Sequence, residues 1–339
     1  MGHTNLFLHY TMKILTNFEN DALEGIVSYI DHELRRCSQE YPDDNIAVFN
    51  GAYWIYNDFP KEEYKDFSRR CLLNFWSPCE FLGGYSPDNF FFDKYDYFTE
   101  VYCVCPYTCA FMNRHFGYEK FKYIPYPWTN LENITFYEYD VDACWFGGIH
   151  GDDHFQGIQS ISKRPHRFIN GGFNNSPQTA PYIRSIATDI GLSTGEKLAK
   201  VAKCKTNLSY NKLYLKGHSA SSKVGDNFNK AFSHYREDML PQLKVRTHEI
   251  VSFKSLLLVK KDPWNLVEDF YTEGKDFLYF SSHDELETII DEVCSDDKAH
   301  RKMVDNAFET HKKYTVERVM EYIVKDSSDL ITWKLNNVQ

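Results

Sequence analysis

The sequence has 339 residues, of which 42% are hydrophobic, and its formal net charge at pH 7 is −10. This length and apolar content are sufficient for two medium-sized domains with buried cores. The acidic balance argues against a nucleic-acid scaffold, because binding along phosphates requires a basic surface. A small anionic ligand in a locally basic cleft is still compatible with it.

The nine cysteines form no C-x-x-C pair. Cys103, Cys105 and Cys109 lie close together but lack the two-pair spacing of a zinc site, so we expect buried free thiols in a reducing compartment. No apolar run reaches 18 residues, and the first 15 residues hold no clean signal-peptide core. We therefore expect a cytoplasmic location without a transmembrane segment; peripheral contact with a membrane stays open.

The first third of the chain alternates between strand and helix patterns. Residues 12–17 predict a strand that runs into the helix-capping pair Asn20-Asp21, and residues 23–34 place apolar side chains on one helical face. Further on we expect a strand at 46–49, a charged helix at 58–76, a strand at 97–104, a helix at 111–116 and a strand at 122–126. This order is typical of an α/β domain, and the Pro-containing polar segment up to residue 133 predicts a linker.

A short apolar strand at residues 141–146 opens the second part, and Gly147-Gly148-Ile149-His150-Gly151 follows it. A strand followed by a glycine-rich turn lets the backbone approach a phosphate closely. After it we expect helices at 158–163, 182–186 and 195–203 and a strand at 166–169. A strand pattern over 203–215 carries Lys205 and Lys212, and either lysine could contact a phosphate.

Residues 240–285 predict a compact helix–strand pattern. An apolar strand at 255–259 and a second at 276–280 are followed by Ser282-x-x-Glu285, the form of a capping box, and by a helix with an apolar face. We interpret this as half of a doubly wound α/β domain. In such sheets ligands bind at the carboxyl ends of the strands and the amino ends of the helices.

This region also resembles a known family. The sequence R-T-H-E at 246–249, the apolar strand after it, Asp262, Glu268 nineteen positions after Glu249, Gly274 and F-L-Y-F-S-S-H-D-E-L resemble the donor-sugar half of group-1 glycosyltransferases with the GT-B fold. The resemblance covers about 142–322. It departs at Pro241, where the family has a Glu, and at Lys254, where the family has a small Gly.

The resemblance implies two Rossmann-like α/β lobes with the active site in the cleft between them. Residues 1–130 would form the acceptor-side domain, residues 134–325 the nucleotide-sugar-binding domain, and residues 326–339 a tail. The donor would be a nucleotide sugar, for example of UDP or GDP, and the acceptor a glycan or another glycosylated molecule; no metal and no further cofactor is expected. The expected donor-binding residues are Gly147, Gly148, His150, Lys205, Lys212, Arg246, Glu249 and Glu268.

The physical case for this site is that a diphosphate requires backbone N–H groups and cations, while a ribose requires a carboxylate acceptor. The glycine turn, Arg246 and Glu249 could supply these groups in turn. An inverting transferase would also require a general base, for which Glu19 and Asp21 at the end of the first strand are candidates.

Three alternatives stay open. The chain could be a catalytically silent protein that binds a sugar nucleotide or glycan. His150, Asp152, Asp153 and His154 could hold a divalent metal in a hydrolase. The D-x-D pattern at 140–142 could bind Mn²⁺. Serine hydrolases, P-loop proteins and dinucleotide dehydrogenases are disfavoured, because G-x-S-x-G, Walker A and G-x-G-x-x-G are missing.

Overall fold

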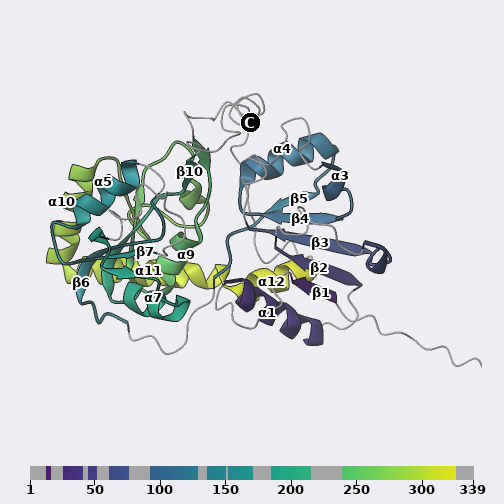
Figure 1. Cartoon of the computed structure of the whole chain (residues 1–339), viewed down its shortest axis with the longest axis horizontal. Coiled ribbons are helices and arrows are strands. Elements are labelled where there is room, and N and C mark those ends of the chain that lie inside the picture. The colour runs from purple at the N-terminus through teal and green to yellow at the C-terminus, as the bar shows by residue number, and fades with distance from the viewer. Residues whose placement is uncertain are drawn as a thin grey trace, which may run out of the picture. The chain divides into compact units, whose positions relative to one another are not determined.

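The computed structural model describes residues 13–16, 26–40, 45–51, 61–75, 92–128, 136–149, 152–170, 185–214 and 239–325. The chain divides into two compact α/β units, one formed by Met1–Ile124 with Val316–Gln339 and the other by Pro125–Thr315 (Figure 1). The division at 125 lies close to the linker expected near 126–133. Helix α12 (Val316–Lys325) belongs to the first unit, whereas the sequence analysis assigned residues up to 325 to the second domain.

The first unit contains a parallel sheet whose strands follow one another in chain order, β1-β2-β3-β4-β5. Its strands are β1 (Lys13–Thr16), β2 (Ile46–Asn50), β3 (Arg69–Asn74), β4 (Glu100–Cys103) and β5 (Phe121–Tyr123). Its helices are α1 (Ile26–Glu40), the 3₁₀ helix η1 (Lys61–Glu63), α3 (Phe92–Tyr95), α4 (Pro106–Phe116) and α12. The expected strand–helix alternation is confirmed.

The expected charged helix at 58–76 is wrong over its second half, which forms strand β3. Cys71, Leu72 and Leu73 are fully buried there, and β3 pairs in parallel with both β2 and β4. A strand that is buried on both faces of a sheet loses the polar alternation that would identify it in a sequence. With Arg69 and Arg70 at its start and no alternation after them, the sequence of β3 does not indicate a strand.

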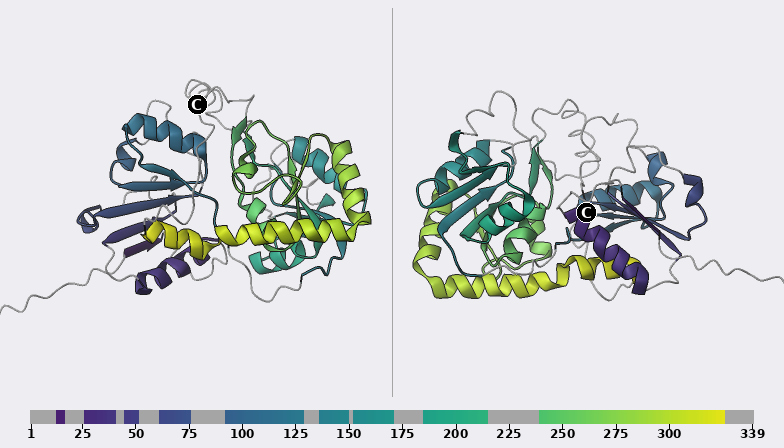
Figure 2. Two further views of the ribbon diagram at one scale, coloured as in Figure 1. Left: turned by 180° about the vertical axis from the view of Figure 1, so that it is seen from behind. Right: turned by 60° about the horizontal axis from the view of Figure 1, so that its bottom comes forward.

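Helix α12 lies beside α1 and buries one face in the first unit (Figure 2). The buried side chains are Val316, Val319, Met320, Ile323 and Val324. Arg69 holds its last turn, because the guanidinium donates to the carbonyl oxygens of Ile323 at 2.7 Å and Val324 at 2.8 Å. The same guanidinium donates to Glu100 at 2.7 Å, so one half-buried cation satisfies the helix end and a carboxylate together.

The second unit contains a six-stranded parallel sheet in the order β13-β12-β9-β6-β7-β8. Its strands are β6 (Val141–Phe146), β7 (His166–Asn170), β8 (Asp189–Ile190), β9 (Cys204–Ser209), β12 (Leu256–Lys260) and β13 (Leu278–Phe280). Counted from β6, this is the strand order 3-2-1-4-5-6 of doubly wound nucleotide-binding folds. The direction of winding reverses between β6 and β9, and such a switch point is where ligands bind.

The helices of this unit are α5 (Asp152–Ile161), α7 (Thr194–Val201), α9 (Val245–Ser252), η3 (Leu266–Asp269), α10 (His283–Ser295), α11 (Asp297–His311) and η4 (Lys312–Tyr314). The capping residue expected for α10 is confirmed, because Ser282 Oγ accepts from the Glu285 amide at 3.1 Å. A complete capping box formed by Ser193 and Glu196 starts α7. An antiparallel hairpin of β10 (Lys212–Tyr214) and β11 (Met239–Pro241) precedes α9.

Candidate functional site

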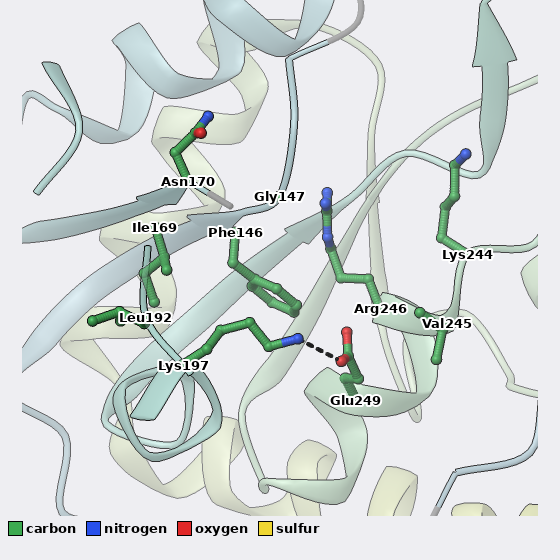
Figure 3. Close-up of a pocket in the computed structure, with 10 residues that line it drawn as sticks. All are labelled: Phe146, Gly147, Ile169, Asn170, Leu192, Lys197, Lys244, Val245, Arg246 and Glu249. Atoms are coloured by element: carbon green, nitrogen blue, oxygen red, sulfur yellow. Dashed lines mark hydrogen bonds and ion pairs between the residues drawn. The ribbon is translucent and has the colours of Figure 1, made fainter. Parts of the chain in front are cut away.

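A pocket of about 320 Å³ lies in the second unit, at the carboxyl ends of β6 and β7 and the amino end of α9 (Figure 3). Its position matches the place where a doubly wound sheet binds ligands, beside the strand at which the winding reverses. The residues that line it are Phe146, Gly147, Ile169, Asn170, Leu192, Lys197, Lys244, Val245, Arg246 and Glu249.

Gly147 forms the turn at the end of β6 and has a φ of 113°, a conformation that favours glycine. A β-carbon at this position would lie 2.0 Å from Nη2 of Arg246. The turn is fixed from two sides: the Gly147 amide donates to the Ile169 carbonyl at 2.9 Å, and the Trp145 indole donates to the Gly147 carbonyl at 3.3 Å. Glycine is thus required both by the backbone and by the adjacent guanidinium.

Arg246 presents its guanidinium to this pocket from the first turn of α9. The guanidinium carbon lies 4.5 Å from the ring centroid of Trp145 and 4.9 Å from that of Phe146. Burial lowers the pKa of Arg246 to about 10, and the negative charge of the Glu249 carboxylate opposes this shift. Among the described residues none forms a hydrogen bond or ion pair with the guanidinium, and its buried Nε has no acceptor. A half-buried, charged guanidinium whose Nε is buried and unsatisfied is a strong site for an anion.

The amino end of α9 adds further donors to the same pocket. Asn211, which follows β9, fixes this end: its side-chain oxygen accepts from the Lys244 amide at 3.0 Å and from the Thr247 hydroxyl at 2.9 Å. The helix has no side-chain cap, and its first turn carries no acidic residue. The Thr247 amide donates to the Lys244 carbonyl at 3.0 Å. The N–H groups of Val245 and Arg246 come before it, and with the helix dipole they favour an anion at this position.

Glu249 lies one turn after Arg246 and contributes the carboxylate of the pocket. Its side chain is 5% exposed, and its Oε1 accepts from the ammonium group of Lys197 at 2.9 Å. Lys197 comes from α7, and its Nζ also lies 5.6 Å from the ring centroid of Phe146. Figure 3 shows the lysine chain passing beneath Phe146 to reach the carboxylate. The ion pair therefore joins two helices across the floor of the pocket.

The pocket is basic although the chain is acidic. Three lining residues are cations, Lys197, Lys244 and Arg246, and one is an anion, Glu249, which gives a local charge of +2. The whole chain has a net charge of −10. Positive charge concentrated at a partly enclosed site raises the local concentration of an anionic ligand.

The structure therefore brings together three of the expected donor-binding residues, Gly147, Arg246 and Glu249. Gly148 follows directly in the same turn but is not among the lining residues. The remaining described candidates have other positions and partners, and nothing places them in this pocket.

Lys205 is the second residue of β9, so it lies near the amino end of that strand, whereas the pocket lies at the carboxyl ends of β6 and β7. Its ammonium donates to the Cys294 carbonyl at 3.3 Å. Lys212 is buried and pairs with Asp153 at 2.6 Å. Glu268 is exposed on η3, and its carboxylate interacts with the Tyr279 hydroxyl. None of these three residues is among those that line the pocket.

Glu19, Asp21 and His150 lie outside the described residues, so the general base stays a prediction. Within the described ranges, no three His, Cys, Asp or Glu side chains are grouped to hold a metal ion. His154 is buried against Trp145 and Tyr210, with ring centroids 4.7 and 4.8 Å away.

The D-x-D candidate lies at the amino end of β6, away from the pocket. Asp140 pairs there with Arg167 at 2.6 Å, and the Asp142 carboxylate interacts with the Cys294 thiol. Both carboxylates thus have structural partners.

The two departures from the family pattern have structural explanations. Lys254 has a φ of 55°, which lies in the left-handed region that favours glycine. Its ammonium pairs with Asp305 at 2.8 Å and donates to the Tyr137 hydroxyl at 2.9 Å. Pro241 ends β11, where it pairs with Lys212 of β10.

Sequence reasoning missed Lys197, Lys244 and Asn170. Lys197 is one of several lysines in a short amphipathic helix, and nothing nearby in the sequence distinguishes it. Asn170 had a usable signal, because it directly ends a predicted strand and is followed by two glycines, as in the turn after β6.

Known proteins resemble this chain in sequence and in fold. Residues 212–325 match the family model described as "Glycosyl transferase-like". No curated protein sequence matches the chain. A glycosyltransferase structure from Rickettsia africae superposes with a TM-score of 0.57 at 10% identity, over 96% of this chain and 98% of that one. The chain has the GT-B fold.

Two further structures share this GT-B fold. A mutant of S. aureus TarM in complex with Fondaparinux, alpha-GlcNAc-glycerol and UDP has a TM-score of 0.53 at 10% identity, over 87% of this chain and 58% of TarM. Anabaena HepE in complex with UDP has a TM-score of 0.51 at 11% identity, over 86% of this chain and 81% of HepE. This chain therefore spans little more than half of TarM.

The resemblance to group-1 GT-B glycosyltransferases, inferred from residues 246–285, is confirmed. The glycosyl transferase-like segment includes α9, with Arg246 and Glu249, and the strands β12 and β13 behind it. In the described parts of this GT-B chain, no helix has the length and apolarity that crossing a membrane requires.

Proposed function

We propose that this GT-B protein is a glycosyltransferase that moves a sugar from a nucleoside diphosphate sugar to a glycan or another glycosylated acceptor. The observation that carries the proposal is the half-buried Arg246 guanidinium, which lines the pocket and forms no hydrogen bond or ion pair with the described residues. A diphosphate supplies the missing anion, and its oxygens match the planar fork of donors on an arginine.

The proposed roles follow the geometry of the pocket. The diphosphate binds between the Gly147 turn and the amino end of α9, where backbone N–H groups and Arg246 converge. Glu249 accepts hydrogen bonds from the vicinal hydroxyl groups of the ribose. The base lies toward Ile169, Asn170 and Leu192 at the other side of the pocket. A volume of about 320 Å³ is within the range of small-molecule sites.

Glycosyl transfer releases a nucleoside diphosphate, so negative charge develops on the leaving group as the bond to the sugar breaks. In the proposed site, Arg246 and the α9 N–H groups stabilise that charge without reorganisation, which is the usual source of electrostatic catalysis. We infer that these donors replace a divalent cation, so that the protein requires no metal and no cofactor beyond the donor. The cytoplasmic location expected from the sequence stays a prediction.

The test has two parts. Calorimetry against UDP, GDP, ADP and CDP measures whether the pocket binds a nucleoside diphosphate; UDP comes first because it occupies the TarM and HepE structures. Turnover is then measured as release of the nucleoside diphosphate from the matching nucleotide sugar. Binding of none of the four would contradict the proposed site. Binding without turnover, across a panel of glycan acceptors, would instead indicate a silent sugar-nucleotide-binding protein.

A further inference from the structure

The pocket contains a second cation whose geometry differs from that of Arg246. The Lys197 ammonium is already engaged, at 2.9 Å from Glu249 Oε1, and its side chain is 28% exposed. The other carboxylate oxygen, Oε2, receives no hydrogen bond from the described residues, although the carboxylate lines the pocket. One oxygen of Glu249 is therefore fixed by a protein cation, and the other is available to a ligand.

The elements that hold this pair are themselves well fixed. The capping box of Ser193 and Glu196 starts α7 just before Lys197, and the Lys197 amide donates to the Ser193 carbonyl at 2.9 Å. The lysine chain is confined further by the ring of Phe146. On the other side, Glu249 lies in α9, whose start is anchored by Asn211. Both partners thus approach each other from rigid helices.

A carboxylate that accepts hydrogen bonds from two vicinal hydroxyl groups must keep one orientation about its last torsion, because both hydrogen bonds depend on that orientation. The torsion of a free carboxylate is broad. An ammonium group bonded to one oxygen restricts that torsion, while the second oxygen keeps its lone pairs for a ligand. This is the arrangement that Lys197 provides.

We propose that Lys197 is the positioning residue for ribose recognition: it fixes the Glu249 carboxylate so that the site selects ribonucleotides over 2′-deoxyribonucleotides. The inference rests on the proposed function, since it requires a nucleotide in this pocket. It goes beyond that function by assigning the sugar selectivity of the nucleotide to an ion pair between α7 and α9.

The test compares affinities for a nucleoside diphosphate and its 2′-deoxy form, for example UDP and dUDP, by calorimetry. A charge-assisted hydrogen bond is worth about 1.5–3 kcal/mol, so wild-type protein is expected to prefer the ribonucleotide by roughly tenfold or more. Lys197→Met should reduce this preference to about twofold or threefold, mainly by weakening the ribonucleotide. Lys197→Arg should restore most of the preference, since it keeps a donor cation.

Lys200→Met is the matched control. Lys200 lies in the same helix, pairs with Asp189 at 2.7 Å and is not among the lining residues. It should leave the preference unchanged. In Glu249→Gln the preference should already be small, and adding Lys197→Met should lower it no further. Melting temperatures of all variants separate loss of selectivity from loss of folding.

Three outcomes would overturn the inference. An equal loss of both affinities in Lys197→Met would mean that the lysine acts only as a general cation for phosphate. A gain in both would mean that it competes with the ligand for Glu249. A wild-type protein that binds both nucleotides equally would remove ribose recognition altogether. If wild-type protein binds no nucleoside diphosphate, the proposed function fails first, and this outcome is distinct from the other three.

Discussion

A β-carbon on Gly147 would lie 2.0 Å from Nη2 of Arg246, so the glycine and the guanidinium occupy directly adjoining space. A β-carbon essentially never lies within 3 Å of another heavy atom, so any larger side chain at position 147 must displace the arginine. The glycine turn and the cation are therefore parts of one site, although they lie 99 positions apart in the sequence.

Gly147→Ala is expected to lower nucleoside diphosphate affinity by at least about tenfold, because it displaces Arg246 and places alanine at a φ of 113°. Calorimetry measures the affinity and thermal unfolding the stability. Gly195→Ala is the control, since nothing lies within 4 Å of its added carbon and its φ is not positive. Equal affinities for the two variants would contradict the coupling between Gly147 and Arg246.

Arg246→Met should weaken nucleoside diphosphate binding by tenfold to a hundredfold, since it removes the charge-assisted bonds to the phosphates. With its pKa lowered to about 10, the guanidinium is still fully charged at neutral pH. Because the free protein holds this half-buried cation without an ion pair to a described residue, the melting temperature should stay equal or rise. A large fall in melting temperature with unchanged affinity would identify Arg246 as structural.

Transfer should survive chelation of divalent metals. If Arg246 and the α9 N–H groups stabilise the leaving diphosphate, activity in EDTA should stay within about twofold of that in Mn²⁺. Activity that EDTA abolishes and Mn²⁺ restores would favour metal ligands instead, in which case Asp140, Asp142 and the segment His150–His154 become the candidates to substitute.

Lys254→Ala should destabilise the protein more than Lys254→Gly, the reverse of the usual order for these residues. Both variants lose the ion pair with Asp305, but only glycine relieves the φ of 55°. A left-handed conformation costs an L-residue roughly 1–2 kcal/mol, so the two variants should differ by about 1 kcal/mol in urea unfolding. If alanine is the more stable variant, the backbone strain at this position is negligible.

Acid should destabilise the second unit through two buried imidazoles. His248 and His311 share the Tyr271 hydroxyl, at 2.8 and 3.3 Å, and burial lowers the pKa of His311 to about 3 and that of His248 well below 6.5. Above pH 6.5 both groups are neutral in the folded and unfolded states. Below it only the unfolded chain gains these protons, so stability falls by about 1.4 kcal/mol per pH unit for each histidine.

His311→Phe tests this effect, because Tyr271 keeps its bond to His248. Between pH 6.5 and 4 the variant should lose about half of the histidine contribution to the pH dependence of unfolding, measured by urea titration at each pH. An unchanged slope would mean that His311 takes up a proton in the folded protein.

The sequence predicted the second unit better than the first, for physical reasons that particular residues illustrate. Strand β6 with its glycine turn and the α9 segment with Arg246 and Glu249 carry local patterns that report on backbone geometry. Strand β3 does not, because its start is polar for a tertiary reason: Arg69 satisfies the end of α12, more than 250 residues away.

The candidate site was predictable only in part for a similar reason. Glu249 was identified, but the cation that engages it, Lys197, lies 52 positions earlier in a helix with other lysines. Conversely, Lys205 and Lys212 lie along a strand pattern in positions that suit a phosphate contact. The pattern alone does not show which end or face of the strand meets the ligand. Only the bounds of β9 show that Lys205 lies near its amino end, and only the packing shows that Lys212 pairs with Asp153.

The first unit is built from both ends of the described chain, since α12 packs beside α1 after the whole second unit has intervened. During synthesis, β1–β5 therefore leave the ribosome long before the helix that covers them exists. The second unit is one uninterrupted segment and is available in full before α12 emerges. Because domains generally fold as units, we expect the nascent chain to complete its second unit before its first, in the reverse of their order in the sequence.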